Sequence, residues 1–287
     1  MATANATWLE SASAGQVVVM WPQISDAQLG TLLQHKTVLA ELVIEGSTEL
    51  TSLSPALDNL VNVSTRLVIA GNTGLLAVSL PALRRVGGSL SLVSLGRAAN
   101  VSIPALLSTG HNLDIQNVGV SELDLSALTV VGGGISMRGL NDVTGPMMRS
   151  ALASLRSIVL LFAVRNIAWS GRPATAFELP ALQRAGGLSL AECSFLSMSF
   201  PALTNITSGG IVMYHLPRLT EFHMMQLAAV RGDVRLSVVA NMPSICNMSG
   251  NIGIGLDHFS RAILSCAPPH TRRAACSAYS VPMLVGC

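Results

Sequence analysis

The sequence predicts a mainly β protein, a parallel β-solenoid of about ten coils, and three observations support this fold class. The unit V-S-L-P-A-L-R-R-V-G-G-S-L-S-L at Val78–Leu92 recurs along the chain. Short apolar-x-apolar segments return about every 23 residues. Few segments between them have helical periodicity. Such a repeat indicates stacked coils, because one coil cannot bury its own leucines and its neighbours must cover them.

The first element expected is a helix at about Asp26–Gln34. Ser25 followed by Gln28 is a capping box, and Leu29, Leu32 and Leu33 form a helical stripe. We expect this helix to cover the first open end of the stack, since an uncovered end coil would expose core and unpaired backbone.

Each coil is then expected to contain a first strand of the form apolar-x-apolar. Its two apolar residues should point into the core, and the residue between them should point to solvent. The expected first strands begin at Leu42, Leu67, Leu90, Leu113, Ile135, Ile158, Leu188, Ile211, Val234 and Ile252. A second short strand should follow ten or eleven residues later and end at a proline, which cannot donate to a ladder. The Gly-Gly pair then allows the turn into the next coil.

The step of 30 residues from Ile158 to Leu188 predicts an insertion of about seven residues at Ala168–Ala176. Insertions in repeats become loops and often lie on a binding face. Trp169 and Arg172 in this segment are residue types found at binding hot spots. The alternative is a drifted loop with Trp169 packed against the stack.

A second capping helix is expected at Leu256–Ser265, where Leu256, Phe259 and Ile263 repeat at helical spacing. We therefore expect a single solenoid domain at residues 25–266, preceded by an extension at 1–24 and followed by a cysteine-containing tail at 267–287.

Four of the five cysteines, Cys246, Cys266, Cys276 and Cys287, lie near the C-terminus and are candidates for disulfide bonds. Three pairings are possible, and free buried thiols are the alternative. Cys193 lies apart from them. Five N-x-S/T sequons occur, at Asn5, Asn62, Asn100, Asn205 and Asn247. Together these features favour a secreted or surface glycoprotein. We expect glycosylation at Asn62, Asn100, Asn205 and Asn247.

Composition narrows the classes of partner. Only 11% of the residues are charged and the net charge is +2, so nucleic acid or an anionic membrane is an unexpected main partner. No apolar run reaches transmembrane length, and the N-terminus lacks the features of a signal peptide. If the protein is exported, we expect this sequence to be a fragment or mature form without its targeting pieces.

The L-P-A-L-x-x-V-G-G-x-L-x-L unit resembles the receptor L-domain repeat across about Ala27–Ile254. That repeat forms the ligand-binding lobes of insulin- and EGF-type receptors and is related to lipid-anchored fungal cell-wall proteins. The resemblance implies a right-handed leucine-rich β-helix outside the cell with no catalytic activity. One departure is His35-Lys36, where the family often has a cysteine, so its N-terminal disulfide is absent.

The expected outward positions were searched for chemistry. On the second strands they are Ser79, Ser102, Asp124, a position near Met147, Glu178, Ser199 and His223. Asp124 and Glu178 would lie two coils apart, about 10 Å, just beyond the carboxylate separation of an inverting glycosidase. The alternative is that both are ordinary solvent-facing residues, which Asp and Glu commonly are. On the first strands the outward positions are Val43, Val68, Ser91, Asp114, Ser136, Val159, Ser189, Val212 and Arg235. This small, weakly polar face suits cover by a partner or a neighbouring chain, although scattered exposed valines are also ordinary.

These observations predict a non-enzymatic extracellular protein of the cell surface or cell wall, acting in structure, adhesion or recognition. No cofactor or metal site is expected, and the expected partner is a protein or glycan ligand, with self-association a further possibility. One alternative is the ligand-binding ectodomain of a membrane receptor. Another is a polysaccharide-cleaving β-helix enzyme that uses Asp124 and Glu178.

Overall fold

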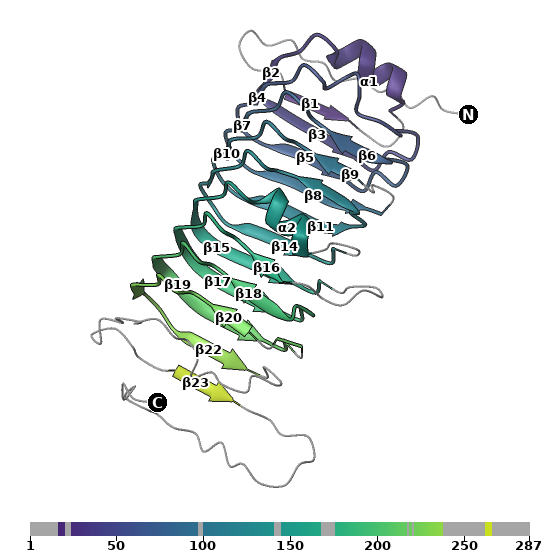
Figure 1. The fold of residues 1–287 in the computed structure, drawn as a ribbon. Coiled ribbons are helices and arrows are strands. Elements are labelled where there is room, and N and C mark those ends of the chain that lie inside the picture. The colour runs from purple at the N-terminus through teal and green to yellow at the C-terminus, as the bar shows by residue number, and fades with distance from the viewer. Residues whose placement is uncertain are drawn as a thin grey trace.

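The computed structural model describes residues 17–20, 24–96, 100–140, 145–167, 176–216, 218–219, 221–237 and 262–265. The prediction of a mainly β parallel solenoid is confirmed, with about eight turns (Figure 1). The expected count of ten included a coil that would begin at Ile252, which lies outside the described residues. The coils stack so that inward residues repeat in register, as in the pairing of Leu67, Leu90 and Leu113 across three rungs.

The solenoid has three faces, which the chain visits in turn. The long face is the outward side of the strands β1 (Val17–Met20), β3 (Glu41–Glu45), β5 (Leu67–Ala70), β8 (Leu90–Leu95), β11 (Leu113–Val118), β14 (Ile135–Arg138), β15 (Ser157–Arg165), β17 (Arg184–Ala191), β19 (Asn205–Tyr214), β22 (Val234–Ser237) and β23 (Ala262–Ser265).

The back face comes next along each coil. It is the outward side of two three-stranded sheets, the first with β6 (Ala77–Ser79), β9 (Asn100–Ser102) and β12 (Glu122–Asp124), the second with β16 (Phe177–Glu178), β18 (Ser197–Ser199) and β20 (Glu221–His223).

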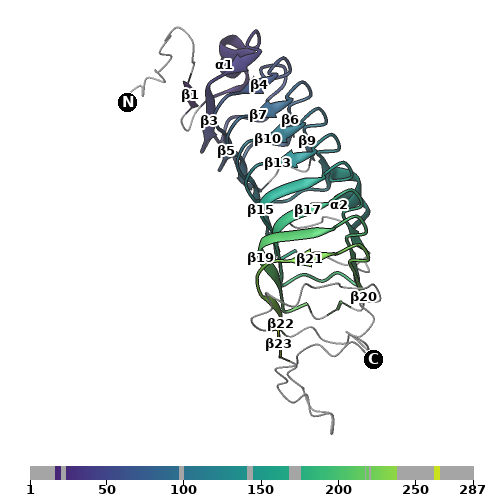
Figure 2. The same cartoon turned by 90° about the vertical axis from the view of Figure 1, so that its left-hand side faces the viewer.

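The side face closes the coil (Figure 2). It is the outward side of β2 (Val38–Leu39), β4 (Asn62–Val63), β7 (Arg85–Val86), β10 (Ser108–Thr109), β13 (Val130–Val131), the first residues of β15, β17 and β19, and β21 (Ala229–Val230). The sequence interpretation had two strands per coil and missed this third segment. Its signal was present, because the inward residue of each side strand follows the inward residue of the back strand by eight positions, as Val86 follows Val78 and Val131 follows Leu123.

The Leu-Pro-Ala-Leu element forms the turn between the back and side faces. In the first such turn the amide of Leu83 donates to the carbonyl of Leu80 at 3.2 Å, and in a later coil the amide of Leu182 donates to the carbonyl of Leu179 at 3.4 Å. Proline therefore occupies the second position of a tight turn, where its fixed φ is suitable and its missing N–H is not needed. Both leucines of the turn are buried.

Two helices interrupt the strands. The helix α1 (Asp26–Leu33) has the predicted capping box between Ser25 and Gln28, buries Leu29 and Leu33, and lies at the N-terminal end of the stack (Figure 1). The helix α2 (Gly145–Ala151) was not expected and takes the place of one back strand. The predicted C-terminal helix is wrong for Ala262–Ser265, which form β23 beside β22; the rest of that segment lies outside the described residues.

The predicted strand start at Ile158 is also wrong. Ile158 pairs with Val131 on the side face, whereas Phe162 pairs with Ile135 and begins the long-face segment. Both residues lie in one apolar run, and β15 joins the two segments through a register shift between Ile158 and Leu161. The steps become 27 and 26 residues, so the extra length is divided between the coil with α2 and the coil that contains Ala168–Ala176.

Inside the stack, leucines of the first coils give way to phenylalanines after the insertions. The ring of Phe177 lies 5.0 Å from Phe195, 6.0 Å from Phe200 and 6.1 Å from Phe162, centroid to centroid. All four rings are fully buried. The buried apolar residues from Ile24 to Val230 form one core cluster, so the described coils share a single continuous interior.

Candidate binding faces

The middle outward row of the long face follows the predicted order with one substitution. In register it contains Val43, Val68, Ser91, Asp114, Ser136, Ala163, Ser189, Val212 and Arg235. Ala163 replaces the predicted Val159, because the strand begins at Phe162. Val43 and Ser189 are buried at 5% exposure, and the others up to Val212 are half-buried. From Val43 to Val212 the row is thus a close-set strip of small side chains.

Asp114 is the charged residue at the centre of this strip. Ser91 and Ser136 pair with it on either side. Partial burial raises the pKa of the Asp114 carboxyl, because the charged form loses hydration. When it is protonated, the group can donate as well as accept a hydrogen bond. The centre of the long face can therefore offer hydroxyl and carboxyl groups to a polar ligand.

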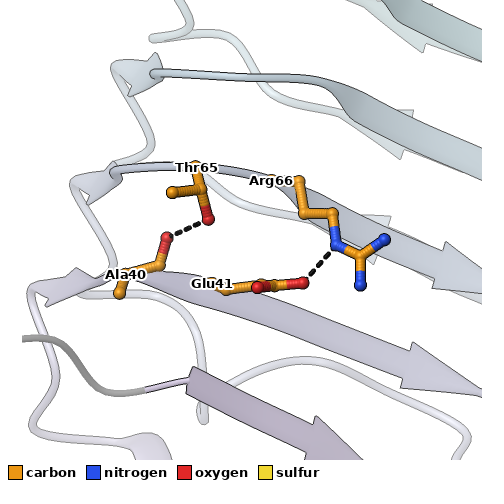
Figure 3. Close-up of polar contacts among 4 residues, drawn as sticks. All are labelled: Ala40, Glu41, Thr65 and Arg66. Atoms are coloured by element: carbon orange, nitrogen blue, oxygen red, sulfur yellow. Dashed lines mark hydrogen bonds and ion pairs between the residues drawn. The ribbon is translucent and has the colours of Figure 1, made fainter.

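Polar contacts between rungs also occur at the edge where the long face begins (Figure 3). Arg66 on one rung forms an ion pair with Glu41 on the rung before it. The Thr65 hydroxyl donates to the carbonyl of Ala40 at 2.7 Å. These groups satisfy one another, so the edge at this end serves the stacking of the coils.

The opposite edge of the long face carries a row of residues with positive φ, one in each of eight successive coils. This left-handed row consists of Gly46, Gly71, Ser94, Asn117, Gly139, Asn166, Glu192 and His215, with φ between 48° and 71°. The five residues other than glycine are all polar and exposed. A side chain in this conformation costs about 1–2 kcal/mol, less for asparagine. The sequence analysis missed this row, since only the register brings these residues together.

Three larger side chains lie beside the left-handed row. Arg138 and Arg165 are exposed and pair in register on adjacent strands. Tyr214 is 49% exposed, and its ring lies 6.1 Å from that of His215. Guanidinium and phenol groups are common in recognition sites because they combine hydrogen bonding with apolar contact area. The left-handed row and these three residues form an exposed polar margin along the long face.

The back face contains the two carboxylates proposed as a catalytic pair. Asp124 is on β12 and Glu178 on β16, which belong to different sheets. The Asp124 carboxylate accepts a hydrogen bond from the amide of Ser126 at 3.0 Å. Glu178 accepts from the Nε of Arg149 on α2 at 3.1 Å. Each carboxylate therefore has its own local partner.

Three of the predicted glycosylation sites lie on described strands. Asn62 begins β4 and Asn205 begins β19, both on the side face, whereas Asn100 begins β9 on the back face. All three are half-exposed. The Asn100 amide donates to Glu122 at 2.9 Å, and the Asn205 amide donates to the Thr204 hydroxyl at 2.9 Å. Strand ends of this kind leave the amide near solvent.

Several predicted residues lie outside the described part of the chain. They are Trp169, Arg172, Asn5, Asn247, Cys246, Cys266, Cys276 and Cys287. The binding loop and the disulfide bonds therefore stay predictions. Cys193 is described and is a free, buried thiol; burial raises its pKa to about 11, and its Sγ lies 3.1 Å from the carbonyl of Ala191.

The described part of the chain has neither a metal-binding cluster nor a membrane-spanning helix. No three histidine, cysteine, aspartate or glutamate side chains there gather in a way that could hold a metal ion. Neither of the helices in this part of the chain is long and apolar enough to cross a membrane.

The architecture defines the class of protein as a parallel β-solenoid. No protein-family model matches the chain, and searches of curated proteins and of solved structures found no significant match.

Proposed function

We propose that this protein is a non-enzymatic recognition or structural glycoprotein of the cell surface or cell wall, which contacts its ligand through the long face. The observation that carries the proposal is the left-handed row. Three coils have glycine at this position, yet five place an exposed polar side chain there at a conformational cost. Retaining these side chains is explained if they contact a ligand.

The arrangement of the face supports this proposal. Parallel rungs about 4.8 Å apart hold each outward side chain in a fixed place, so binding would require little additional ordering. The ligand we propose is extended and polar, either a glycan chain or a strand-like protein segment. It would lie along the solenoid axis between the Ser91–Asp114–Ser136 strip and the polar margin.

The resemblance to receptor L-domains also supports an extracellular role, since it is based on the repeat unit at Val78–Leu92 and its copies. It accommodates two forms of the proposal, a wall or adhesion protein and the ectodomain of a receptor. The full-length gene distinguishes them, because a membrane span or kinase would support the receptor and a lipid-anchor signal would support the wall protein.

Binding is tested by presenting the chain, secreted from eukaryotic cells, to a glycan array and to intact cell surfaces. The variant Ser91→Arg/Ser136→Arg places two large side chains beside Asp114 and should abolish the signal. The matched control is Ser197→Arg/Ser199→Arg, which changes two half-exposed serines of β18 on the back face and alters no sequon. Equal binding by both variants would contradict the use of the long face.

The extracellular setting has a separate test. Asn62, Asn100 and Asn205 should each carry a glycan when the chain passes through a secretory pathway. Treatment with a glycosidase should then increase the gel mobility of the chain, and each Asn→Gln substitution should reduce this increase by the contribution of one glycan. A secreted chain without glycan at any of the three positions would argue against the glycoprotein assignment.

A further inference from the structure

The side face has a composition unlike the other two. Its exposed arginines and apolar residues form a patch, here called the side patch, that consists of Arg84, Arg85, Leu107, Val130, Arg156 and Arg184. All six are exposed, Leu107 at 48% and Val130 at 40%. Sequence reasoning did not single them out, because they lie in or immediately before the third strand of each coil.

The side patch is continuous in space although its members span about a hundred residues of sequence. The amide of Leu107 donates to the carbonyl of Arg84 at 2.8 Å, and the amide of Thr129 donates to Leu107 at 3.0 Å. The amide of Arg156 then donates to Thr129 at 2.9 Å. Arg84 and Arg156 are therefore three rungs apart, about 14 Å at the usual strand spacing.

Arginine pairs lie at both ends of the side patch and apolar residues lie between them. Arg84 and Arg85 occupy one rung, Leu107 and Val130 the next two, and Arg156 and Arg184 the two after these. The apolar centre extends toward the corner of the solenoid through Val159 and Leu160 in the bulge of β15, which are 51% and 55% exposed.

The positive charge of the side patch is not balanced locally. Among the described outward positions of the side-face strands, none is an aspartate or glutamate. The two ion pairs found in the described part of the chain, Arg66–Glu41 and Arg149–Glu178, lie elsewhere. The patch therefore presents four guanidinium groups around an exposed apolar centre.

We infer that the side patch is a docking surface for an acidic protein that presents an apolar centre flanked by carboxylates. Arginine is enriched at protein interfaces, and an apolar core with a charged rim is their usual anatomy. Each guanidinium can bind a carboxylate through two hydrogen bonds. An anionic polysaccharide would satisfy the arginines but would leave Leu107, Val130, Val159 and Leu160 without an apolar partner.

Two predicted glycosylation sites, Asn62 and Asn205, flank the side patch and leave its centre uncovered. Asn62 pairs with Arg85 on the rung before the side patch, and Asn205 pairs with Arg184 on the rung after it. Glycans at these two positions would stand at the two ends of the patch and leave its apolar centre open. The inference does not depend on the proposed function of the long face, because the two surfaces share no residue.

The experiment uses the full chain and a synthetic peptide in which glutamates flank a leucine-rich centre. Binding is measured by calorimetry or fluorescence anisotropy at increasing salt. The wild-type chain should bind, and the affinity should fall as salt screens the charges. Arg84→Glu/Arg85→Glu/Arg156→Glu/Arg184→Glu should lose at least about tenfold in affinity and should bind instead a peptide with lysine in place of glutamate.

The control is Arg218→Glu, which reverses an exposed arginine between β19 and β20, outside both the side patch and the polar margin, and should leave peptide binding unchanged. Leu107→Ser/Val130→Ser tests the apolar centre and should weaken binding while the arginines remain. Circular dichroism verifies the fold of each variant. Equal weakening by the control and the patch variants would overturn the inference, as would binding to phosphatidylcholine–phosphatidylserine vesicles in place of the peptide.

Discussion

At the scale of single residues, backbone conformation is the property that most clearly separates one coil from another. Gly46, Gly71 and Gly139 turn the chain out of the long face at little conformational cost. Ser94 and Glu192 occupy equivalent positions with φ of 54° each, where their Cβ atoms are disfavoured. The solenoid therefore contains local strain whose removal should be measurable.

We expect Ser94→Gly and Glu192→Gly each to raise the free energy of unfolding by about 1 kcal/mol, because glycine adopts a positive φ without the Cβ penalty. Urea denaturation provides the measurement. Ser94→Ala is the control and should bring no gain, since it keeps the Cβ. If either glycine variant also lost ligand binding, the assignment of the left-handed row to recognition would be strengthened. A glycine variant less stable than wild type would contradict the strain argument.

At the scale of elements, the corners between the side and long faces depend on glycine for a different reason, the close approach of successive rungs. A Cβ added to Gly87 would lie 2.0 Å from the carbonyl oxygen of Ser64. A Cβ on Gly110 would lie 1.8 Å from the carbonyl of Gly87. The Gly-Gly element thus permits tight stacking as well as the turn that its sequence predicted.

Gly87→Ala should lower the free energy of unfolding by about 2–3 kcal/mol or more, because backbone must move to relieve the overlap. Thermal denaturation tests this expectation. Gly30→Ala in α1 serves as the comparison, since nothing lies within 4 Å of its added Cβ and alanine favours a helix interior by up to about 1 kcal/mol. Similar effects of the two substitutions would show that the corner can accommodate an added Cβ without backbone movement.

The attachment of α1 to the next coil depends on one carboxylate. Asp26 accepts hydrogen bonds from the amides of Thr51 at 2.8 Å and Ser52 at 3.1 Å, and from the Thr51 hydroxyl. Partial burial alone would raise the pKa of Asp26, but these hydrogen bonds outweigh it and hold the pKa below its ordinary value of 3.8. The bonds therefore favour the charged form and stabilise the helix.

The sign of the pH dependence follows from the lowered pKa. The contribution of Asp26 to stability is complete above its unfolded pKa and is lost as the pH falls through the lower folded value. Asp26→Asn should therefore reduce stability at neutral pH, and its difference from wild type should shrink in acid below 3.8. Urea unfolding across this pH range is the measurement. A difference that stays constant with pH would exclude a role for the charge.

Helix starts and turns could be predicted from the sequence where the residues that form their hydrogen bonds lie within a few positions of one another. The capping box at Ser25 and the Leu-Pro-Ala-Leu turns both use hydrogen bonds three residues apart, and both formed as local chemistry dictates. The strand at Ala262–Ser265 was mistaken for part of a helix because Ile263 continues a helical spacing. Pairing with β22 overrides that weak local preference.

At the scale of the whole molecule, the solenoid is a stack with a shared interior. Each coil buries leucines against its neighbours, and the phenylalanines around Phe177 continue that interior through the coils that follow the insertions. Removing apolar volume from a central rung should therefore affect coils on both sides of it.

Leu113 on β11 is fully buried near the middle of the stack. Leu113→Ala should lower the free energy of unfolding by about 2–5 kcal/mol through lost contacts and a cavity. Hydrogen exchange should show reduced protection in β5 and β17 as well as β11, because the core is continuous. Val130→Ala, at an exposed position, should leave the exchange pattern unchanged. Loss of protection confined to β8, β11 and β14 would show that the coils unfold separately.

The repeat pattern alone predicts that the coils are β, that they stack, and where the chain turns between them. These properties follow from the spacing of leucines, prolines and glycines within one repeat. The packing of the coils establishes that Phe162 rather than Ile158 begins a long-face segment, and that α2 replaces a back strand. The same packing brings together the side chains of the left-handed row and of the side patch. The physical reason is that register is set between residues more than twenty positions apart, by the fit of each coil against the one below it.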